Sequence, residues 1–408
     1  MSKKRIVITG LGIVSPIGIG KDEFWKNLFA GKSGIKTITL FDTSKLKVKV
    51  GGEITDFNAK EILGKKGLID LDRATKLLLA AGKFALEDSG CDIDEANTNS
   101  TGISVGTTFG SLSSLSNFDR ASLAEGPHFV NPSRFPNTVI NSPASRMAIR
   151  YKIKGFCSTI STGECSALNA LEYAMNAIEF GRAQRVLVGC VQEMCIQIFL
   201  GLYKVNYLSG MNYRAAVSSP FDKERDGIVF SEGAGVFLIE DIEAALKRKA
   251  KIYSEILSIS SNFDPYRLYK YNPKGEGMKE SMDSAISEAK FLAADVDCIF
   301  ANANSTLDAD LIEAKVINEI FNKSVPVTAI KSIIGETMSA SGGMSIAAGI
   351  GSLIKQKIPP VINHKTKDPD CDLNYVLEKN SGKSVNKILI NSFAPHGANS
   401  SLVLGKVS

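Results

Sequence analysis

The order of strands and helices predicted from the sequence runs through the chain twice, and this repeat limits the possible folds more than any other feature. In each half a buried apolar strand precedes a long helix rich in small residues. A Gly-Glu pair opens each of these helices, at residues 163–164 and 335–336, and we expect the two pairs to occupy matching places in the halves. A duplicated unit that buries the two helices side by side is the simplest arrangement consistent with both halves. We therefore predict an α/β fold with an N-terminal half, residues 1–250, and a C-terminal half, residues 251–408.

The other elements follow from apolar runs and helical spacing. The first half is predicted to hold strands at 5–9, 103–106, 185–189 and a pair near 228 and 236–240, with helices at 22–30, 72–89 and 164–180. The second half is predicted to hold strands at 252–259, 298–301, 325–329, 388–391 and 402–404, with helices at 278–293, 308–321 and 339–353. The glycine-rich stretch after the first strand is expected to be a turn. Residues 107–141 show little periodicity, so we expect a long loop that is functional or buried in an interface.

Composition and charge exclude several classes of protein. With 44% apolar and 22% charged residues, the chain is typical of a soluble globular protein. A formal net charge of +5 over 408 residues does not indicate a nucleic-acid partner, although it would suit an acidic one such as a carrier protein. No apolar run reaches the roughly 18 residues of a membrane helix, so we expect a cytoplasmic protein without a membrane partner.

Cofactor and metal sites are not indicated either. The seven cysteines are scattered and lack Cys-x-x-Cys spacing, so neither a disulfide framework nor a zinc site is predicted. Gly10-Leu11-Gly12 follows a strand, but the third glycine of the dinucleotide fingerprint is misplaced and the acidic residue that should follow is missing. We therefore expect no nicotinamide cofactor, and no other cofactor or metal.

A possible active-site turn lies at residues 158–168, where an extended run meets a glycine and opens a helix. Such a turn presents its first helical side chain at the positive end of the helix dipole, where a nucleophile would be activated. The residue there is Glu164, with Cys165 next to it. A carboxylate in this place is a stabilised anion that attacks poorly, so the turn has the position of a catalytic site without its nucleophile. The alternative that Glu164 is only an ordinary acidic helix start remains open.

Several further segments match one family. They are residues 6–20, 72–76, 135–142 and 220–235, Asn302-Ala303, Lys331-Ser332 and residues 391–393. With these segments the chain resembles the β-ketoacyl-acyl-carrier-protein synthases of the thiolase fold over nearly its whole length. The resemblance implies a duplicated, five-layer αβαβα architecture.

The resemblance also implies that the usual catalytic groups are missing. Such synthases use a cysteine nucleophile, two histidines and a lysine that orders the second histidine. In this chain the cysteine position falls on Glu164, the first histidine becomes Asn304 and the second becomes Glu336, while Lys331 is retained. The three histidines of the chain, at 128, 364 and 396, lie at no matching position. If Glu164 and Glu336 are buried, we expect them to share a proton or to be paired with donors such as Asn304, Lys331 or the backbone N–H groups of the two helix starts.

This pattern resembles the chain length factors, or ketosynthase β subunits, of type II polyketide synthases. Members of that group pair with a catalytic ketosynthase and shape an interface channel for the growing chain, and an acyl carrier protein is the further partner. The resemblance places Phe109, Phe135 and Thr138 at this channel, and it puts Pro395 where active relatives carry a gating residue. We expect the strand at 185–190 to supply the apolar face for the partner.

Three other functions remain open from the sequence. The chain could be a condensing enzyme that uses Cys165 as its nucleophile, although a free cysteine is more often a small core residue. It could be a malonyl-carrier decarboxylase, although related decarboxylases keep both histidines. It could also be a scaffold that binds its partner and a carrier protein without shaping any channel.

Overall fold

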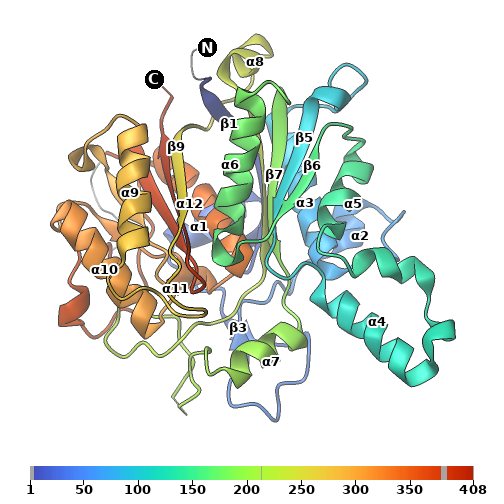
Figure 1. Ribbon diagram of the computed structural model, residues 1–408, viewed down its shortest axis with the longest axis horizontal. Helices are drawn as coiled ribbons and strands as arrows, with labels where there is room; N and C mark the ends of the chain where they lie inside the picture. Colours follow the sequence, from blue (N-terminus) through green and yellow to red (C-terminus); the bar gives the residue numbers. More distant parts are fainter. Residues whose placement is uncertain (1–3, 213, 378–383, 408) are drawn as a thin grey trace.

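The computed structural model describes residues 4–212, 214–377 and 384–407, and a sheet of 11 strands runs through the middle of the molecule (Figure 1). The strands of the first half are β1 (Ile6–Ser15), β2 (Gly18–Ile19), β5 (Thr101–Gly106), β6 (Cys157–Ile160), β7 (Arg185–Gln192) and β8 (Gly233–Asp241). Those of the second half are β9 (Ser254–Phe263), β10 (Cys298–Phe300), β11 (Val327–Thr328), β12 (Lys387–Phe393) and β13 (Ala398–Gly405). Their order is β11-β10-β12-β13-β9-β1-β8-β7-β5-β6, with β2 paired to β1. The halves therefore meet where β1 pairs with β9. A separate small ribbon joins β3 (Lys36–Thr37) and β4 (Val50–Gly51).

The helices form layers on and between the two parts of the sheet. They are α1 (Lys21–Phe29), α2 (Ala59–Leu63), α3 (Arg73–Ser89), α4 (Leu112–Glu125), α5 (Ser142–Tyr151), α6 (Ser166–Glu179), α7 (Ile196–Lys204), α8 (Ile242–Lys247), α9 (Glu276–Glu288), α10 (Leu307–Phe321), α11 (Lys331–Ile334) and α12 (Ser341–Lys355). Helices α6 and α12 lie between the two parts of the sheet, α3 covers the outer face of one part, and α9 and α10 cover that of the other (Figure 1). This is the five-layer αβαβα fold that the resemblance implied. No helix in the described ranges has both the length and the apolar character to cross a bilayer.

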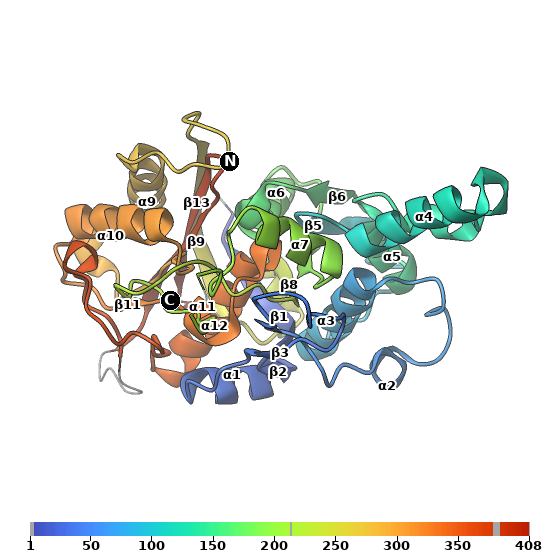
Figure 2. The ribbon, with the colours of Figure 1, turned by 90° about the horizontal axis from the view of Figure 1, so that it is seen from below.

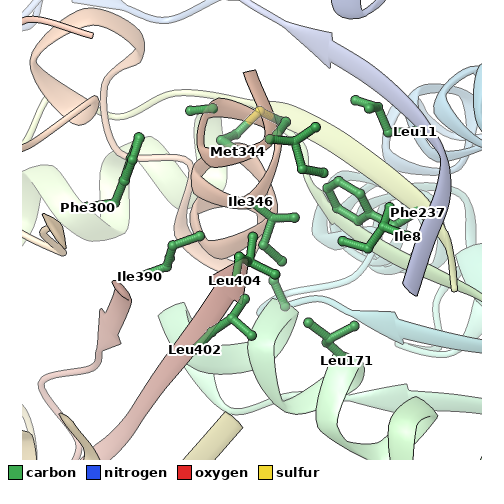
Figure 3. Packing of buried hydrophobic residues seen from close by; sticks show 14 of the residues in the cluster. Ile8, Leu11, Leu171, Phe237, Phe300, Met344, Ile346, Ile390, Leu402 and Leu404 are labelled. Carbon is green, nitrogen blue, oxygen red and sulfur yellow. The ribbon is translucent and has the colours of Figure 1, made fainter. Parts of the chain in front are cut away.

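The two central helices pack directly against one another, as predicted. A Cβ added at Gly342 of α12 would lie 3.2 Å from Ala167 and Leu168 of α6, so the helices approach closely where a glycine replaces a larger residue. Apolar side chains from both helices, from β8 and from β13 then form one core cluster (Figure 3). Leu171, Met344 and Leu404 are among its fully buried members.

The starts of the two central helices match each other, but not through their Gly-Glu pairs. Each helix is preceded by a 3-10 turn, and the first residue of that turn has a positive φ, 59° at Gly163 and 47° at Met338. Gly163 thus corresponds to Met338, whereas the second Gly-Glu pair lies three residues earlier, at 335–336. The prediction that the two pairs occupy matching places is wrong for this reason. Both helices also begin two residues later than predicted.

Helix α3 is confirmed, and its packing explains an error next to it. Strand β1 does not stop at residue 9 but runs to Ser15, through the stretch expected to be a turn. A Cβ at Gly12 would lie 2.0 Å from the carbonyl oxygen of Ala81, and a Cβ at Gly10 would lie 2.4 Å from that of Ala85. These glycines let the strand lie directly against α3, so they serve close packing and not a turn.

Two other stretches differ from the prediction. Residues 107–141 contain the regular helix α4 and short 3-10 turns at 127–129 and 132–137 in place of a continuous loop. None of the residues of α4 is buried, and the helix projects away from the body of the molecule (Figure 2). A helix that buries none of its residues needs no apolar stripe, so periodicity could not reveal it. The strand expected near Ile228 is only an isolated bridge to Leu208.

Strand β7 is an interior strand and cannot form a partner face. It pairs with β5 along one edge and β8 along the other, and α3 and α6 cover its two faces. Val186, Leu187 and Val188 are accordingly core residues. The prediction that the strand at 185–190 faces a partner is therefore wrong. The outer strand of this half is β6, where Cys157 is exposed.

Candidate functional site

Glu164 lies in the interior, on the 3-10 turn that joins β6 to α6. Its residue is 3% exposed, and its backbone carbonyl accepts a hydrogen bond of 2.8 Å from the hydroxyl of Ser392 on β12. Gly163 before it has a positive φ, and Thr108 donates to the Gly163 carbonyl at 3.2 Å. The turn is thus fixed by elements from both halves, which meet around the Glu164 side chain.

Asn304 is positioned by the acidic residues of α10. The Asp310 carboxylate accepts the backbone N–H of Asn304 at 2.9 Å, and the Glu313 carboxylate accepts those of Asn302 and Ala303 at 2.9 and 2.8 Å. Burial raises the pKa of Asp310 to about 6 and that of Glu313 to about 7, although these hydrogen bonds oppose the rise. The loop after β10 is therefore tied to α10 by its backbone, while Asn304 Oδ1 accepts from the Thr306 hydroxyl at 2.8 Å and Nδ2 remains available to the site.

Glu336 is held by four donors. Lys331 Nζ lies 2.7 Å from one carboxylate oxygen, Oε2, and Asn304 Nδ2 donates to the same oxygen at 3.3 Å. The other oxygen accepts the backbone N–H of Met338 at 2.8 Å and the hydroxyl of Ser341 at 2.5 Å. All of these groups are buried. Since both oxygens are occupied and the charge is balanced, Glu336 is a structural anion and not an available base.

The retained lysine completes a chain of contacts across the site. Lys331 Nζ also donates to Asn302 Oδ1 at 3.0 Å, and Asn302 Nδ2 donates to the carbonyl oxygen of Phe393 at 3.2 Å. Asn304, Glu336 and Lys331 thus lie in one buried cluster, and the buried Glu164 is near enough for the charges of Glu336 and Lys331 to act on it. Within the described ranges, no group of three or more His, Cys, Asp and Glu side chains could hold a metal ion.

Glu164 is less well paired than Glu336. Burial, followed by repulsion from Glu336, raises its pKa to about 7, and its own backbone N–H and the charge of Lys331 offset only part of this rise. The expectation that buried carboxylates here would be paired is confirmed for Glu336. For Glu164 the expectation is met only through its own backbone N–H at the helix start, and among the described side chains neither a hydrogen bond from Asn304 or Lys331 nor a proton shared with Glu336 is seen.

Cys165 is not placed as a nucleophile. Its sulfur lies 3.0 Å from the carbonyl oxygen of Ser392 and 3.2 Å from that of Ala398, between β12 and β13. The residue is fully buried, and burial followed by the charge of Glu164 raises the pKa of the thiol well above its usual value. A neutral thiol that donates to a backbone carbonyl is a core group, because the reactive form is the thiolate.

His396 lies against the turn of Glu164, although it matches no catalytic position. A Cβ added at Gly163 would lie 2.3 Å from Cε1 of the imidazole, so only a glycine fits beneath the ring. Burial lowers the pKa of His396. Pro395, at the gate position, precedes it on the partly buried turn between β12 and β13. No sequence motif indicates this contact, which joins residues more than 200 positions apart.

The expected channel residues lie outside the buried cluster. Phe109 is 39% exposed and Phe135 is 58% exposed, and the Phe135 ring packs on Phe118 of α4 with 5.9 Å between centroids. The Thr138 hydroxyl donates to the carbonyl of Phe135. Because Thr108 contacts Gly163, Phe109 is near the turn of Glu164, whereas Phe135 and Thr138 belong to the projecting α4 region.

Two family models match the chain, the N-terminal domain of β-ketoacyl synthases over residues 3–245 and their C-terminal domain over residues 253–365. The chain belongs to the β-ketoacyl synthase family. Among curated β-ketoacyl synthases, it is 32% identical to 3-oxoacyl-[acyl-carrier-protein] synthase 2 of Coxiella burnetii, with 100% of both chains covered. It is 31% identical to the enzyme of the same name from Synechocystis, with 100% of this chain and 99% of that one covered.

Solved structures of β-ketoacyl synthases superpose over the full length of the chain. The ishigamide ketosynthase/chain length factor matches with a TM-score of 0.93 and 28% identity, and 100% of each chain is covered. A type II polyketide synthase complex, AntDE:AntF, in which an acyl carrier protein is bound to its ketosynthase, matches with a TM-score of 0.90 and 26% identity, again with 100% of each chain covered.

Proposed function

We propose that this member of the β-ketoacyl synthase family is a non-catalytic subunit of the chain length factor type, which pairs with a catalytic ketosynthase in type II polyketide synthesis. The observation that carries the proposal is the cluster of Glu164, Asn304 and Glu336 at the catalytic positions. Acyl transfer to an enzyme needs an activated nucleophile and groups that stabilise the developing oxyanion. Here the nucleophile position holds a buried carboxyl group, and the second histidine position holds an anion locked to Lys331.

The structural relatives support the proposed partners. One is a ketosynthase/chain length factor, and the other is a ketosynthase in complex with its acyl carrier protein. Both match this chain from end to end, so a pairing of the same kind is compatible with its fold. We infer that the partners are a ketosynthase α subunit and an acyl carrier protein.

The surface of the first half offers a place for the ketosynthase. Strand β6 pairs with β5 along one edge only, among the residues that the structure describes, and an unpaired strand edge is a ready site for association. Beside it, the 107–141 segment exposes many large apolar side chains, which is typical of an interface. They are Phe109, Leu115, Leu123, Phe129, Phe135, Val139 and Ile140. In the proposed pair, Phe109, Phe135 and Thr138 would line the channel of the growing chain.

The two enzyme alternatives find less support. A condensing enzyme based on Cys165 would have to free a thiol that lies between two backbone carbonyls and turn it toward the site. A malonyl-carrier decarboxylase would need groups that polarise the thioester, but Glu336 presents a negative charge there and Asn304 is engaged by it. The pure scaffold remains the competing function, because it makes no demand on the channel.

Coexpression with an intact ketosynthase tests the proposal and separates it from the scaffold. We expect a one-to-one complex whose product becomes longer when Phe109→Ala or Phe135→Ala removes a ring, because a packed wall limits added carbons. Leu246→Ala, at an exposed residue of α8, is the control and should leave the product unchanged. If both phenylalanine variants gave the original product from an intact complex, the channel role would be wrong and the scaffold role would be favoured.

A further inference from the structure

Two tyrosines lie at the candidate site although neither is at a catalytic position of the family. They come from separate loops. Tyr207 follows α7, and its backbone is fixed on both sides, because its N–H donates to Leu202 and its carbonyl accepts from Ile228, each at 3.0 Å. Tyr271 lies in the loop between β9 and α9 and is 9% exposed. The two loops are far apart in the sequence, so it is the fold that brings the two rings close together.

The Tyr271 hydroxyl reaches the network that holds Lys331. It lies 3.4 Å from the carbonyl oxygen of Phe393, which also accepts the amide of Asn302 at 3.2 Å. Asn302 in turn accepts from Lys331 Nζ at 3.0 Å. The ring of Tyr271 therefore extends into the interior up to the groups that support the Lys331–Glu336 ion pair.

The Tyr207 hydroxyl is buried and makes no well-formed hydrogen bond to any part of the chain that the structure describes. Its polar neighbours are the Asn304 amide and the Tyr271 hydroxyl, and the charges of Glu164 and Glu336 act on it after burial to raise its pKa. A buried hydroxyl without a partner is unfavourable. Hydrogen bonding thus does not explain why a tyrosine stands here, which leaves the volume of its ring as the reason.

His396 contacts the turn of Glu164 from a third loop. Its imidazole lies on Gly163, the residue before Glu164, and comes from the turn between β12 and β13. Glu164, Asn304 and Glu336 are each 3% exposed or less, which agrees with a site that is filled by the chain itself.

We propose that the rings of Tyr207 and Tyr271 occupy the space in front of Glu164, so that the site excludes an acyl chain by its shape as well as by its chemistry. This inference goes beyond the proposed function, because it concerns access in the chain alone and needs no partner. It has a direct consequence. Replacement of Glu164 by a nucleophile supplies a reactive atom, but the nucleophile remains inaccessible until the two rings are removed.

The test measures how fast iodoacetamide alkylates a thiol introduced by Glu164→Cys in the full-length chain, with exposed Cys157 replaced by serine. Fragment spectra separate position 164 from Cys165. We expect alkylation in the folded protein to be at least roughly a hundredfold slower than in urea, because a buried thiol reacts only when the structure opens. Adding Tyr207→Ala and Tyr271→Ala should raise the rate in the folded protein by about tenfold or more.

The matched control keeps the rings and removes the hydroxyls, through Tyr207→Phe and Tyr271→Phe, and its rate should stay slow. Buried Cys190 and Cys298 report on folding in the same digests, since they must remain unmodified. The proposal is overturned if Glu164→Cys alone is alkylated within about tenfold of its rate in urea. It is also overturned if loss of both rings leaves the rate unchanged while Cys190 and Cys298 stay protected. The comparison of Glu164→Cys in the folded protein and in urea does not use the alanine variants, so it can overturn the proposal even if those variants unfold. Neither outcome bears on pairing with a ketosynthase.

Discussion

At the scale of single residues, the ion pair of Lys331 and Glu336 is the most constrained contact of the site. Their side chains are 4% and 1% exposed, and removal of one partner leaves the other charge buried without compensation. We predict that Lys331→Met lowers the free energy of unfolding by about 3 kcal/mol in urea titrations. The matched control is Lys323→Met, which breaks a half-exposed pair with Asp372 and should cost much less, because water screens that pair. Equal losses in the two variants would contradict a buried, uncompensated charge.

The burial of Glu164 leads to a prediction about how the free energy of unfolding depends on pH. Its pKa rises from 4.5 to about 7 on folding, chiefly through burial, so the folded state keeps a proton that the unfolded state loses in this range. The stabilisation that this group contributes to the folded state is fully present below pH 4.5 and is lost as the pH rises through about 7. Glu164→Gln should remove the effect, so that the loss of unfolding free energy between pH 5 and pH 8 is about 2 kcal/mol smaller than in the unaltered protein.

The experiment must compare Glu164→Gln with the unaltered protein, because burial also raises the pKa values of Glu193 and Glu313 to about 7 and both groups add to the pH dependence. Glu288→Gln, at an exposed position of α9, is the control and should keep the original dependence. An unaltered slope in Glu164→Gln would mean that this carboxyl group is ionised or solvated in the folded protein.

At the scale of elements, the close approach of β1 and α3 depends on glycine. We predict that Gly12→Ala costs about 3 kcal/mol of stability, because the added Cβ would lie 2.0 Å from the backbone oxygen of Ala81, and backbone cannot move aside as a flexible side chain can. Gly201→Ala, within α7, is the matched control. No atom lies within 4 Å of its Cβ, so the substitution should stabilise the protein by up to about 1 kcal/mol through helix propensity. Urea titration measures both, and a well-tolerated Gly12→Ala would contradict this packing.

The same elements show what the sequence could and could not predict. Helices α3 and α6 were found because they bury one face, which leaves apolar residues at helical spacing. Strand β1 was cut short because glycine indicates turns and close packing alike, and only the position of α3 distinguishes them. Helix α4 was missed because it buries none of its residues. The strand at 185–190 was correctly placed, but its apolar character reflected coverage by two layers of the same chain and not by a partner.

At the scale of the whole molecule, the site depends on contacts between segments that are far apart in the chain. Glu164, Asn304, Glu336 and Lys331 were predicted together because a resemblance to known synthases aligned them, and the structure places them in one cluster. Tyr207, Tyr271 and His396 were not predicted, since they lie on loops without periodicity or motif. Whether such side chains reach the site depends on the packing of both halves, which local sequence patterns do not report.

The most direct test of the central claim, that this chain is the non-catalytic member of a pair, is the intact mass of each subunit after the reconstituted complex is incubated with an acyl-loaded carrier protein. We predict that the catalytic ketosynthase gains one acyl group while this chain keeps its original mass, since Glu164 cannot form the thioester and Cys165 is buried as a neutral thiol. An acyl adduct on Cys165, or condensation by this chain without its partner, would contradict the account.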